Sequence, residues 1–346
     1  MTEPDVVDPD APIVDPHHHL WDGRAGHHGG SGAYLLDELL ADLYSGHRVE
    51  STVYVECGSF YDRSRPEAEQ SAGEVEFANG VAALCRSGEY GPARVAASIV
   101  AHADLLRGPA VDRALEAVVA AGNGRVVGIR HVTANDPAAK QLAPPGTLVD
   151  PRFRDGYARL AAHGLTFDAW LYHPQLDELH ALAAGRPDVP VAINHAGGLL
   201  GAGPYADCRE AAFADWRRAL GRLAALPQVH VKLGGFFMPA FGFGFEDRAF
   251  DETDLAAAAR PIVETCLELF GPDRCMFESN FPMTRYFVGY RQLWNSYKLC
   301  VADLTAAERA AVLHDTAQRF YAIPSPVGAA DGIQPEAALV SRAKRE

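Results

Sequence analysis

Three consecutive histidines near the start of the chain are the residues best suited to chemistry. Residues 13–21 read I-V-D-P-H-H-H-L-W, so an apolar stretch leads directly into them. Alternate side chains of a strand share a face, which predicts that Asp15, His17 and His19 point one way. His18 then points the other way and is assigned a structural role. Two imidazoles backed by a carboxylate can bind a divalent metal or polarise a substrate oxygen, so His17 and His19 are functional candidates.

Further polar side chains stand at the ends of other short apolar runs, where buried strands do not need them. The candidates for acid, base or orienting roles are Glu56, His131, His173, His195, Glu278 and Asn280, and those for substrate binding are Trp21, Arg130, Tyr172 and Lys232. The alternative for the charged members is a paired ionic layer inside the fold, because lone buried charges are costly. A functional role is favoured for Arg130, whose planar guanidinium suits a carboxylate, and for His195, which precedes a glycine turn. His173 precedes a proline and is equally suited to capping a helix.

Eight short apolar or β-branched runs must position these residues. The runs are 13–19, 51–58, 94–100, 125–131, 165–173, 189–195, 229–235 and 275–280. Segments with helical periodicity follow them, for example 34–44, 110–121, 206–226 and 253–270. Alternating strands and helices indicate a parallel sheet, and eight such units favour closure into a (β/α)₈ TIM barrel. Catalytic groups are then expected where the strands end.

Side-chain alternation also predicts which residues face the barrel interior. In the second run, Val53 and Val55 are expected to pack on the helices, which leaves Tyr54 and Glu56 facing inward. In the seventh run, Lys232 faces inward by the same rule. The interior is therefore expected to hold several charged groups.

The chain reads as a single domain with short extensions. Residues 1–12 are interpreted as a disordered leader, 13–322 as the barrel and 323–346 as a loose tail. A final helix is expected over 305–320, where the sequence begins with a capping-box pattern. Segment 234–245 (G-G-F-F-M-P-A-F-G-F-G-F) is interpreted as a hydrophobic plug, with a movable substrate lid as the alternative.

The composition of the chain argues against some classes of binding partner. The 346 residues carry a formal net charge of −14, which argues against nucleic acid and anionic membrane surfaces. Local arginines still allow a small anionic substrate. The six cysteines form no C-x-x-C pair, and the first residues resemble no signal peptide, which favours a cytoplasmic protein with reduced thiols. A small-molecule substrate is expected, and exposed apolar loops are compatible with a homodimer.

Five motifs carry a family resemblance across residues 13–322. In order they are D-P-H-H-H-L-W-D, V-V-G-I-R-H, N-H-A-G-G, V-K-L-G-G and M-F-E-S-N-F-P. Together they resemble the amidohydrolase-related (amidohydrolase family 2) metal-dependent hydrolases, and more narrowly the branch of sugar-acid and pyrone-dicarboxylate lactonases. The resemblance implies a distorted barrel, an H-x-H pair at His17 and His19, and a strand-six histidine at His195.

The chain departs from that family at the last motif. The family's strand-eight aspartate, a proton-shuttling base, falls on Asn280, and an amide cannot take a proton near neutral pH. The bridging strand-four lysine of the wider superfamily is also missing, so a binuclear centre is not expected. From strand parity, Glu278 or Glu56 is proposed as the replacement base or as an additional metal ligand.

Three functions remain open from the sequence. The first is hydrolysis of a lactone or similar cyclic ester, with the carbonyl polarised by one Zn²⁺ on His17, His19 and His195 or by these imidazoles without metal. In this hypothesis Arg130 holds a substrate carboxylate, and His131 or His173 assists the oxyanion or leaving group. The second is metal-dependent decarboxylation of a small aromatic acid. The third is a binding barrel that has lost catalysis.

Overall fold

The computed structural model describes residues 5–23, 32–137, 139–245 and 249–324, and within them one parallel sheet of eight strands in sequential order. The strands are β1 (Pro12–His18), β2 (Arg48–Val55), β3 (Arg94–His102), β4 (Val126–Arg130), β5 (Thr166–Ala169), β6 (Val191–Ile193), β7 (Val229–Leu233) and β8 (Cys275–Phe277). Just beyond β8 the ring is bridged, because Asn280 N donates to His17 O at 2.9 Å and His19 N donates to Phe281 O at 2.8 Å. The predicted, nearly closed TIM barrel is confirmed.

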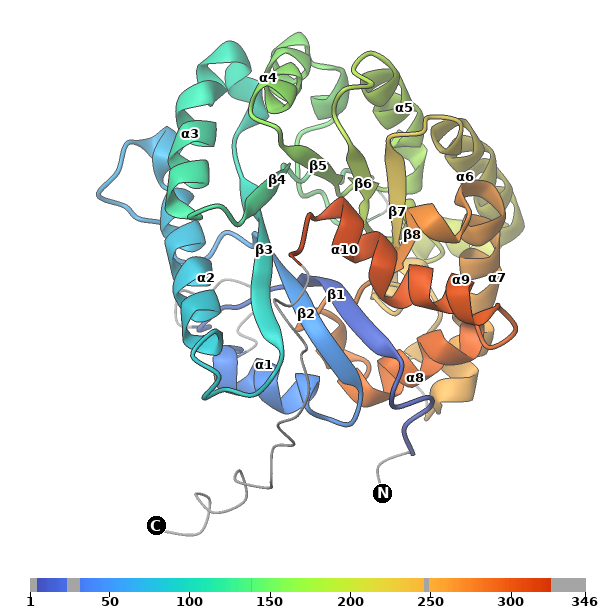
Figure 1. Ribbon diagram of the computed structural model, residues 1–346. Helices are drawn as coiled ribbons and strands as arrows, with labels where there is room; N and C mark the ends of the chain where they lie inside the picture. The colour runs from blue at the N-terminus through green and yellow to red at the C-terminus, as the bar shows by residue number, and fades with distance from the viewer. Residues whose placement is uncertain (1–4, 24–31, 138, 246–248, 325–346) are drawn as a thin grey trace.

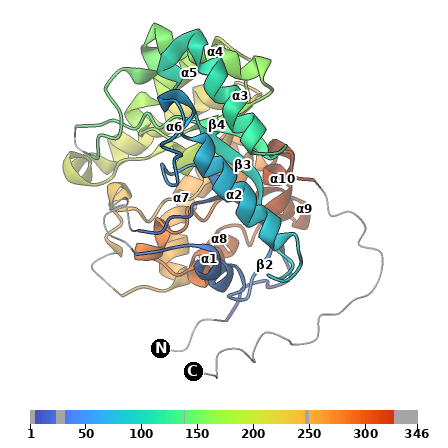
Figure 2. The same cartoon turned by 90° about the vertical axis from the view of Figure 1, so that its left-hand side faces the viewer.

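Helices surround the strands and alternate with them along the chain (Figure 1). They are α1 (Leu36–Leu43), α2 (Ala72–Cys85), α3 (Asp112–Ala121), α4 (Pro151–Ala162), α5 (Leu176–Ala184), α6 (Arg209–Ala224), α7 (Glu252–Phe270), α8 (Tyr290–Cys300), α9 (Ala306–Ala310) and α10 (Thr316–Phe320). Figure 2, turned by 90°, shows α2 and α3 side by side on the outside of the barrel. Among the helices of the described residues, none combines the length and apolarity needed to cross a bilayer.

The final helical segment covers one end of the barrel. It begins at the predicted capping box, in which Thr305 N donates to Glu308 Oε2 at 2.9 Å and Glu308 N donates to Thr305 Oγ1 at 3.3 Å. Between α9 and α10 the chain makes one wide π-helical turn, so the predicted helix over 305–320 is irregular in the middle. From α10, Ala317 and the following Tyr321 pack against the apolar residues inside the barrel.

An irregularity in β1 overturns one prediction of side-chain facing. The pairing with β2 shifts between Asp15 and His18. As a result Asp15 lies opposite to His17 and points to the helical layer, where it accepts hydrogen bonds from Ser279 N at 2.9 Å and Tyr290 Oη at 3.1 Å. An extra residue in a strand reverses the parity of everything after it, which alternation alone cannot show. His18 does face outward, with its Nε2 2.9 Å from Thr52 Oγ1.

The faces of β2 are also reversed from the prediction. Val53 and Val55 lie in the apolar cluster inside the barrel, whereas Tyr54 packs among the surrounding helices and donates to Glu74 of α2 at 2.9 Å. The prediction extended the alternation back from Glu56, but the alternation does not continue from Val55 to that residue. Parity then breaks at the strand end, so Glu56 still reaches the interior cavity.

The start of the chain is held more firmly than a disordered leader would be. Val7 N donates to Asn295 Oδ1 at 2.8 Å, and Lys298 Nζ donates to Asp8 O at 2.6 Å. Both partners belong to α8, so residues 5–11 pack along that helix. Residues 1–4 and 325–346, which include most of the expected tail, lie outside the described residues.

Candidate active site

A cavity of about 390 Å³ opens where the strands end, and most of the predicted site residues surround it. Its polar lining residues are His19, Glu56, Arg130, Lys140, His195 and Asn280, and its main apolar ones are Trp21, Val132, Leu142, Trp170, Tyr172, Met238 and Met283. The carboxyl end of the strands is where TIM-barrel enzymes place their chemistry. Neither His131 nor His173 is among the lining residues. Their Nδ1 atoms instead accept hydrogen bonds from Leu105 N and Leu200 N, each at 3.1 Å.

The histidines of β1 and of the turn after β6 meet at the base of this cavity. The ring centroids of His17 and His195 are 4.9 Å apart, and the Nε2 atoms of His17 and His19 are 3.2 Å apart. Glu278 lies beneath two of the rings, with one oxygen 2.6 Å from His17 Nδ1 and the other 2.6 Å from His195 Nδ1. The structure therefore brings together residues from the first, sixth and eighth strand ends.

These contacts fix which ring nitrogens carry protons. A carboxylate and a carbonyl can only accept, so Nδ1 of His17 and His195 donates to Glu278, and Nδ1 of His19 donates to Val55 O at 2.7 Å. Burial lowers the pKa of His17 well below its ordinary 6.5 despite the attraction of Glu278, so the ring is neutral. In neutral rings of this tautomer, Nε2 carries a lone pair. A ring in this state can offer Nε2 as a ligand to a cation.

Glu278 orients these rings and is unsuited to act as a general base. Burial would raise its pKa, but the interactions with His195 and His17 lower that pKa well below the ordinary 4.5. A carboxylate stabilised in this way holds its negative charge and is a poor proton acceptor. Its oxygen also accepts from the His195 backbone N–H at 3.0 Å, so it fixes the backbone as well as the ring.

Below the histidines lies a buried ion pair that sequence reasoning found only in part. Lys232 Nζ is 2.7 Å from Asp168 Oδ2, 2.9 Å from Pro16 O and 4.0 Å from Glu278 Oε2, and both charged side chains of the pair are fully buried. Lys232 lies beneath the cavity and not among its lining residues, in the paired ionic layer considered as the alternative. Asp168 was missed. The available signal was a single acid within the apolar run 165–173, which demands a buried partner.

Arg130 is already paired within the protein. Its Nε donates to Glu56 Oε1 at 2.6 Å, and its Nη2 donates to the carbonyl of the same residue. Burial would raise the pKa of Glu56, but the positive charge of Arg130 outweighs it and lowers that pKa, so both groups are ionised. The remaining nitrogen, Nη1, lies 3.2 Å from His17 Nε2. The guanidinium fork that a substrate carboxylate would need is therefore occupied by Glu56.

The turn that carries His195 has an unusual backbone. His195 and Ala196 adopt φ values of +52° and +49°, in the left-handed region where non-glycine residues are strained by about 1–3 kcal/mol each. The Trp216 indole donates to Ala196 O at 2.6 Å and helps to hold the turn. Gly235 after β7 makes room, since a Cβ there would lie 2.7 Å from His195 Nδ1. The hydrogen bond from Trp216 and the space at Gly235 together allow the His195 ring to lie against Glu278.

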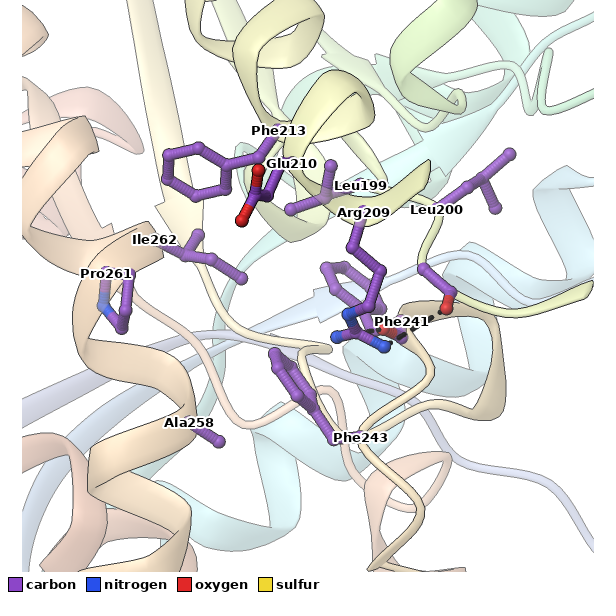
Figure 3. Close-up of a pocket in the computed structure, with 11 residues that line it drawn as sticks. Leu199, Leu200, Arg209, Glu210, Phe213, Phe241, Phe243, Ala258, Pro261 and Ile262 are labelled. Carbon is purple, nitrogen blue, oxygen red and sulfur yellow. Dashed lines mark hydrogen bonds between the residues drawn. The ribbon is translucent and has the colours of Figure 1, made fainter. Parts of the chain in front are cut away.

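A second cavity, of about 380 Å³, lies between α6, α7 and the loop after β7 (Figure 3). Phe213, Phe241, Phe243 and Ile262 form much of its wall, and Arg209 donates to the carbonyl of Gly201 at 3.1 Å. The cavity contains none of the predicted catalytic groups. Segment 234–245 packs mainly as the predicted plug, with Phe236, Phe237, Phe241 and Phe245 buried, while Met238 reaches the catalytic cavity.

The histidine cluster suits a divalent cation. His17, His195 and Glu278 present ligand atoms that all lie within 4.8 Å of one another. His17 Nε2 and His19 Nε2 lie 3.2 Å apart, which is unfavourable for two unprotonated nitrogens unless a cation or proton lies nearby. Two imidazole ligands of one tetrahedral Zn²⁺, with Zn–N bonds of about 2.0–2.1 Å, have nitrogens at about this separation. The donor set is thus one that divalent metals accept.

A parallel barrel with carboxylate-held histidines at the strand ends defines a TIM-barrel hydrolase. The chain belongs to the amidohydrolase family, whose model matches residues 14–323. It is 31% identical over 330 residues to the uncharacterised protein y4mH of Sinorhizobium fredii, covering 91% of this chain and 99% of that protein. It is 28% identical over 319 residues to an L-fucono-1,5-lactonase of Burkholderia multivorans, covering 91% and 98%. A zinc-bound amidohydrolase structure from Burkholderia multivorans superimposes with a TM-score of 0.69 at 26% identity, covering 91% and 100%.

Proposed function

We propose that the protein hydrolyses the lactone of a small sugar acid, opening the ring to a hydroxy acid. The observation that carries the proposal is the cluster of His17, His19 and His195, whose Nδ1 atoms face Glu278 and Val55 O, so that their Nε2 atoms can act as ligands or proton acceptors. The similarity to a fuconolactonase over nearly the full length supports a lactone as the substrate class.

The cavity supplies binding groups for one small ring. Its volume of about 390 Å³ lies at the lower end of the range for small-molecule sites, and Trp21, Trp170 and Tyr172 offer flat apolar surfaces for the ring face. Asn280 also lines the cavity, where its amide can hold a substrate hydroxyl or carbonyl but cannot remove a proton. Because Glu56 pairs with Arg130, this guanidinium is not available as a bidentate partner for a substrate carboxylate.

We propose His17, His19 and His195 as the residues that hold one Zn²⁺, with Glu278 fixing two of the rings. When bound, such an ion polarises a carbonyl and lowers the pKa of a coordinated water towards about 7. The chain itself orients the rings through Glu278 and Val55 O and excludes bulk water with the aromatic wall. A metal-free reaction would require one of these imidazoles to carry a proton on Nε2, so that it could donate to the substrate carbonyl.

The proposal is tested by assaying purified protein against five- and six-membered sugar-acid lactones, following proton release and identifying the product by NMR. Metal content is measured on the same sample, and activity is compared before and after chelation and Zn²⁺ addition. We expect ring opening by the wild type and loss of at least about 100-fold in kcat/KM for His195→Asn, a size typical for loss of one catalytic group. His180→Asn, on α5, is the control. Carbon dioxide release from hydroxybenzoates without lactone turnover would overturn the proposal.

A further inference from the structure

Arg130 contacts the histidine cluster at His17 Nε2, the nitrogen that would bind the proposed metal. Its Nη1 lies 3.2 Å from His17 Nε2. A guanidinium has donors and no acceptor, so the lone pair of His17 Nε2 is directed at Arg130. This agrees with the tautomer already fixed on the other side of the ring, where His17 Nδ1 donates to Glu278 at 2.6 Å.

The guanidinium also separates His17 from the cavity. His17 is fully buried and is not among the residues that line the cavity, whereas Arg130 is one of them. The side chain of Arg130 is held in this place by Glu56, at 2.6 Å from Nε. An ion that bound His17 Nε2 would therefore compete with Arg130 Nη1 for that nitrogen.

We propose that Arg130 is the resident cation of the His17 site, and that Arg130 and a divalent metal are alternative partners of His17 Nε2. One lone pair serves one partner at a time, and two positive charges about 3–4 Å apart in a buried site repel strongly. Entry of the metal frees Nη1 towards the cavity, where it can donate to a substrate oxygen. Metal binding and binding of an oxygen-rich ligand are then coupled, and the coupling is reciprocal. The inference rests on the metal site in the proposed function.

The test measures Zn²⁺ affinity directly, by calorimetry and by competition with a chelator, without substrate. Arg130→Lys keeps the charge but loses the fork that reaches both Glu56 and His17. The double variant Arg130→Met/Glu56→Gln removes both charges, so no unpaired buried carboxylate remains. We expect each to bind Zn²⁺ at least about tenfold more tightly than the wild type, with Co²⁺ absorption bands showing imidazole ligation. Near-ultraviolet circular dichroism checks that the variants fold.

Lys140→Met is the matched control, because Lys140 lines the same cavity and removing it tests the general effect of positive charge. If Lys140→Met tightens Zn²⁺ binding as much as the Arg130 variants do, long-range repulsion suffices and the inference is wrong. Wild-type affinity in both folded Arg130 variants, or no binding in any of the proteins, also overturns it. Zn²⁺ binding by the Arg130 variants but not by the wild type or Lys140→Met supports the inference. The lactone assay is a separate measurement. If the metal-binding test contradicts the inference while lactone turnover is intact, the proposed function is still supported.

Discussion

The two halves of the barrel interior are equally buried but differ in chemistry. At the end covered by α10, the interior is made of Val14, Val53, Val55, Val100 and Met276, which pack against Tyr321 and its neighbours. Toward the cavity, the interior holds His17, Asp168, Lys232 and Glu278, none of them more than 1% exposed. The apolar half needs only shape and volume. The polar half needs a partner for each charge, because an unpaired buried charge costs several kcal/mol.

Tyr321 contacts both the apolar and the polar half of the barrel interior. Its ring packs in the apolar cluster, its hydroxyl lies 3.0 Å from both oxygens of Asp168, and Lys232 Nζ lies 4.9 Å from its ring centroid. Asp168 in turn pairs with Lys232, whose ammonium lies under the histidine cluster. The histidine cluster therefore lies directly against the ion pair, and Tyr321 connects the ion pair to the apolar residues at the covered end.

The largest expected effect comes from unpairing the polar half. Lys232→Met should destabilise the fold by about 3–5 kcal/mol, because it leaves Asp168 and Glu278 buried without their cation. Adding Asp168→Asn should recover part of the loss, since the second substitution removes the uncompensated charge. Urea unfolding of both variants measures the difference.

Lys298→Met is a useful comparison for that experiment. Lys298 is also buried, but its ammonium contacts Asp8 O and His47 Nδ1 rather than a carboxylate side chain. The loss of stability in Lys298→Met should therefore be smaller than that in Lys232→Met. If Lys232→Met is no worse than Lys298→Met, or if the double variant is simply the sum of its parts, charge pairing is not what distinguishes the polar half.

A somewhat smaller loss is expected in the apolar half. Met276→Ala should cost about 2–5 kcal/mol through lost burial and a residual cavity. Unlike the changes in the ion pair, it should leave the metal affinity and the activity per folded molecule unchanged, because Met276 contacts the covered end rather than the histidines. Urea unfolding combined with Zn²⁺ calorimetry tests this, and a large drop in affinity would show that the halves are not independent.

The sequence was sufficient for the architecture and for most of the polar residues that line the cavity, because strand–helix alternation and polar strand ends are local patterns. It was not sufficient for side-chain facing, because one irregularity reverses the facing of the residues beyond it. A shift in β1 placed Asp15 and His17 on opposite faces, and a break in alternation after Val55 reversed the predicted faces of Val53 and Tyr54. His131 and His173 stand at plausible positions but are turned away by backbone donors. The partnership of Asp168 and Lys232 depends on the curvature that brings the inward side chains of strands five and seven together across strand six, which no local pattern reports.

The hydroxyl of Tyr321 offers a finer test of the junction. Tyr321→Phe removes the donor to Asp168 while keeping the ring, and should cost about 1–3 kcal/mol. Tyr157→Phe is the matched control, because the buried Tyr157 hydroxyl has no hydrogen-bond partner among the described residues and its removal should cost little. Equal effects in urea unfolding would mean that the junction bond contributes nothing beyond burial.

Glu74 of α2 shows what happens to a buried carboxylate without a cation. Its Oε1 accepts from Tyr54 Oη at 2.9 Å, Cys57 N at 2.8 Å and Ser59 N at 3.3 Å, and no ion pair to it is found among the described residues. Burial, with the nearby charge of Glu56, raises its pKa from 4.5 to about 7. The pKa of Glu278, equally buried but held by two histidines, is lowered instead. Pairing, rather than burial, decides the ionisation state.

This contrast predicts a pH-dependent effect of Glu74→Gln on stability. A carboxyl group whose folded-state pKa is raised stabilises the fold below its unfolded pKa, near 4.5, and loses that contribution as pH rises through about 7. Glutamine keeps an acceptor at Oε1 and cannot ionise, so the variant should match the wild type near pH 5 and become relatively more stable by pH 8. Urea unfolding at both pH values measures this, with the exposed Glu76→Gln on the same helix as control. Parallel pH profiles for wild type and Glu74→Gln would show that Glu74 stays ionised without a cation, and that pairing is not the deciding factor.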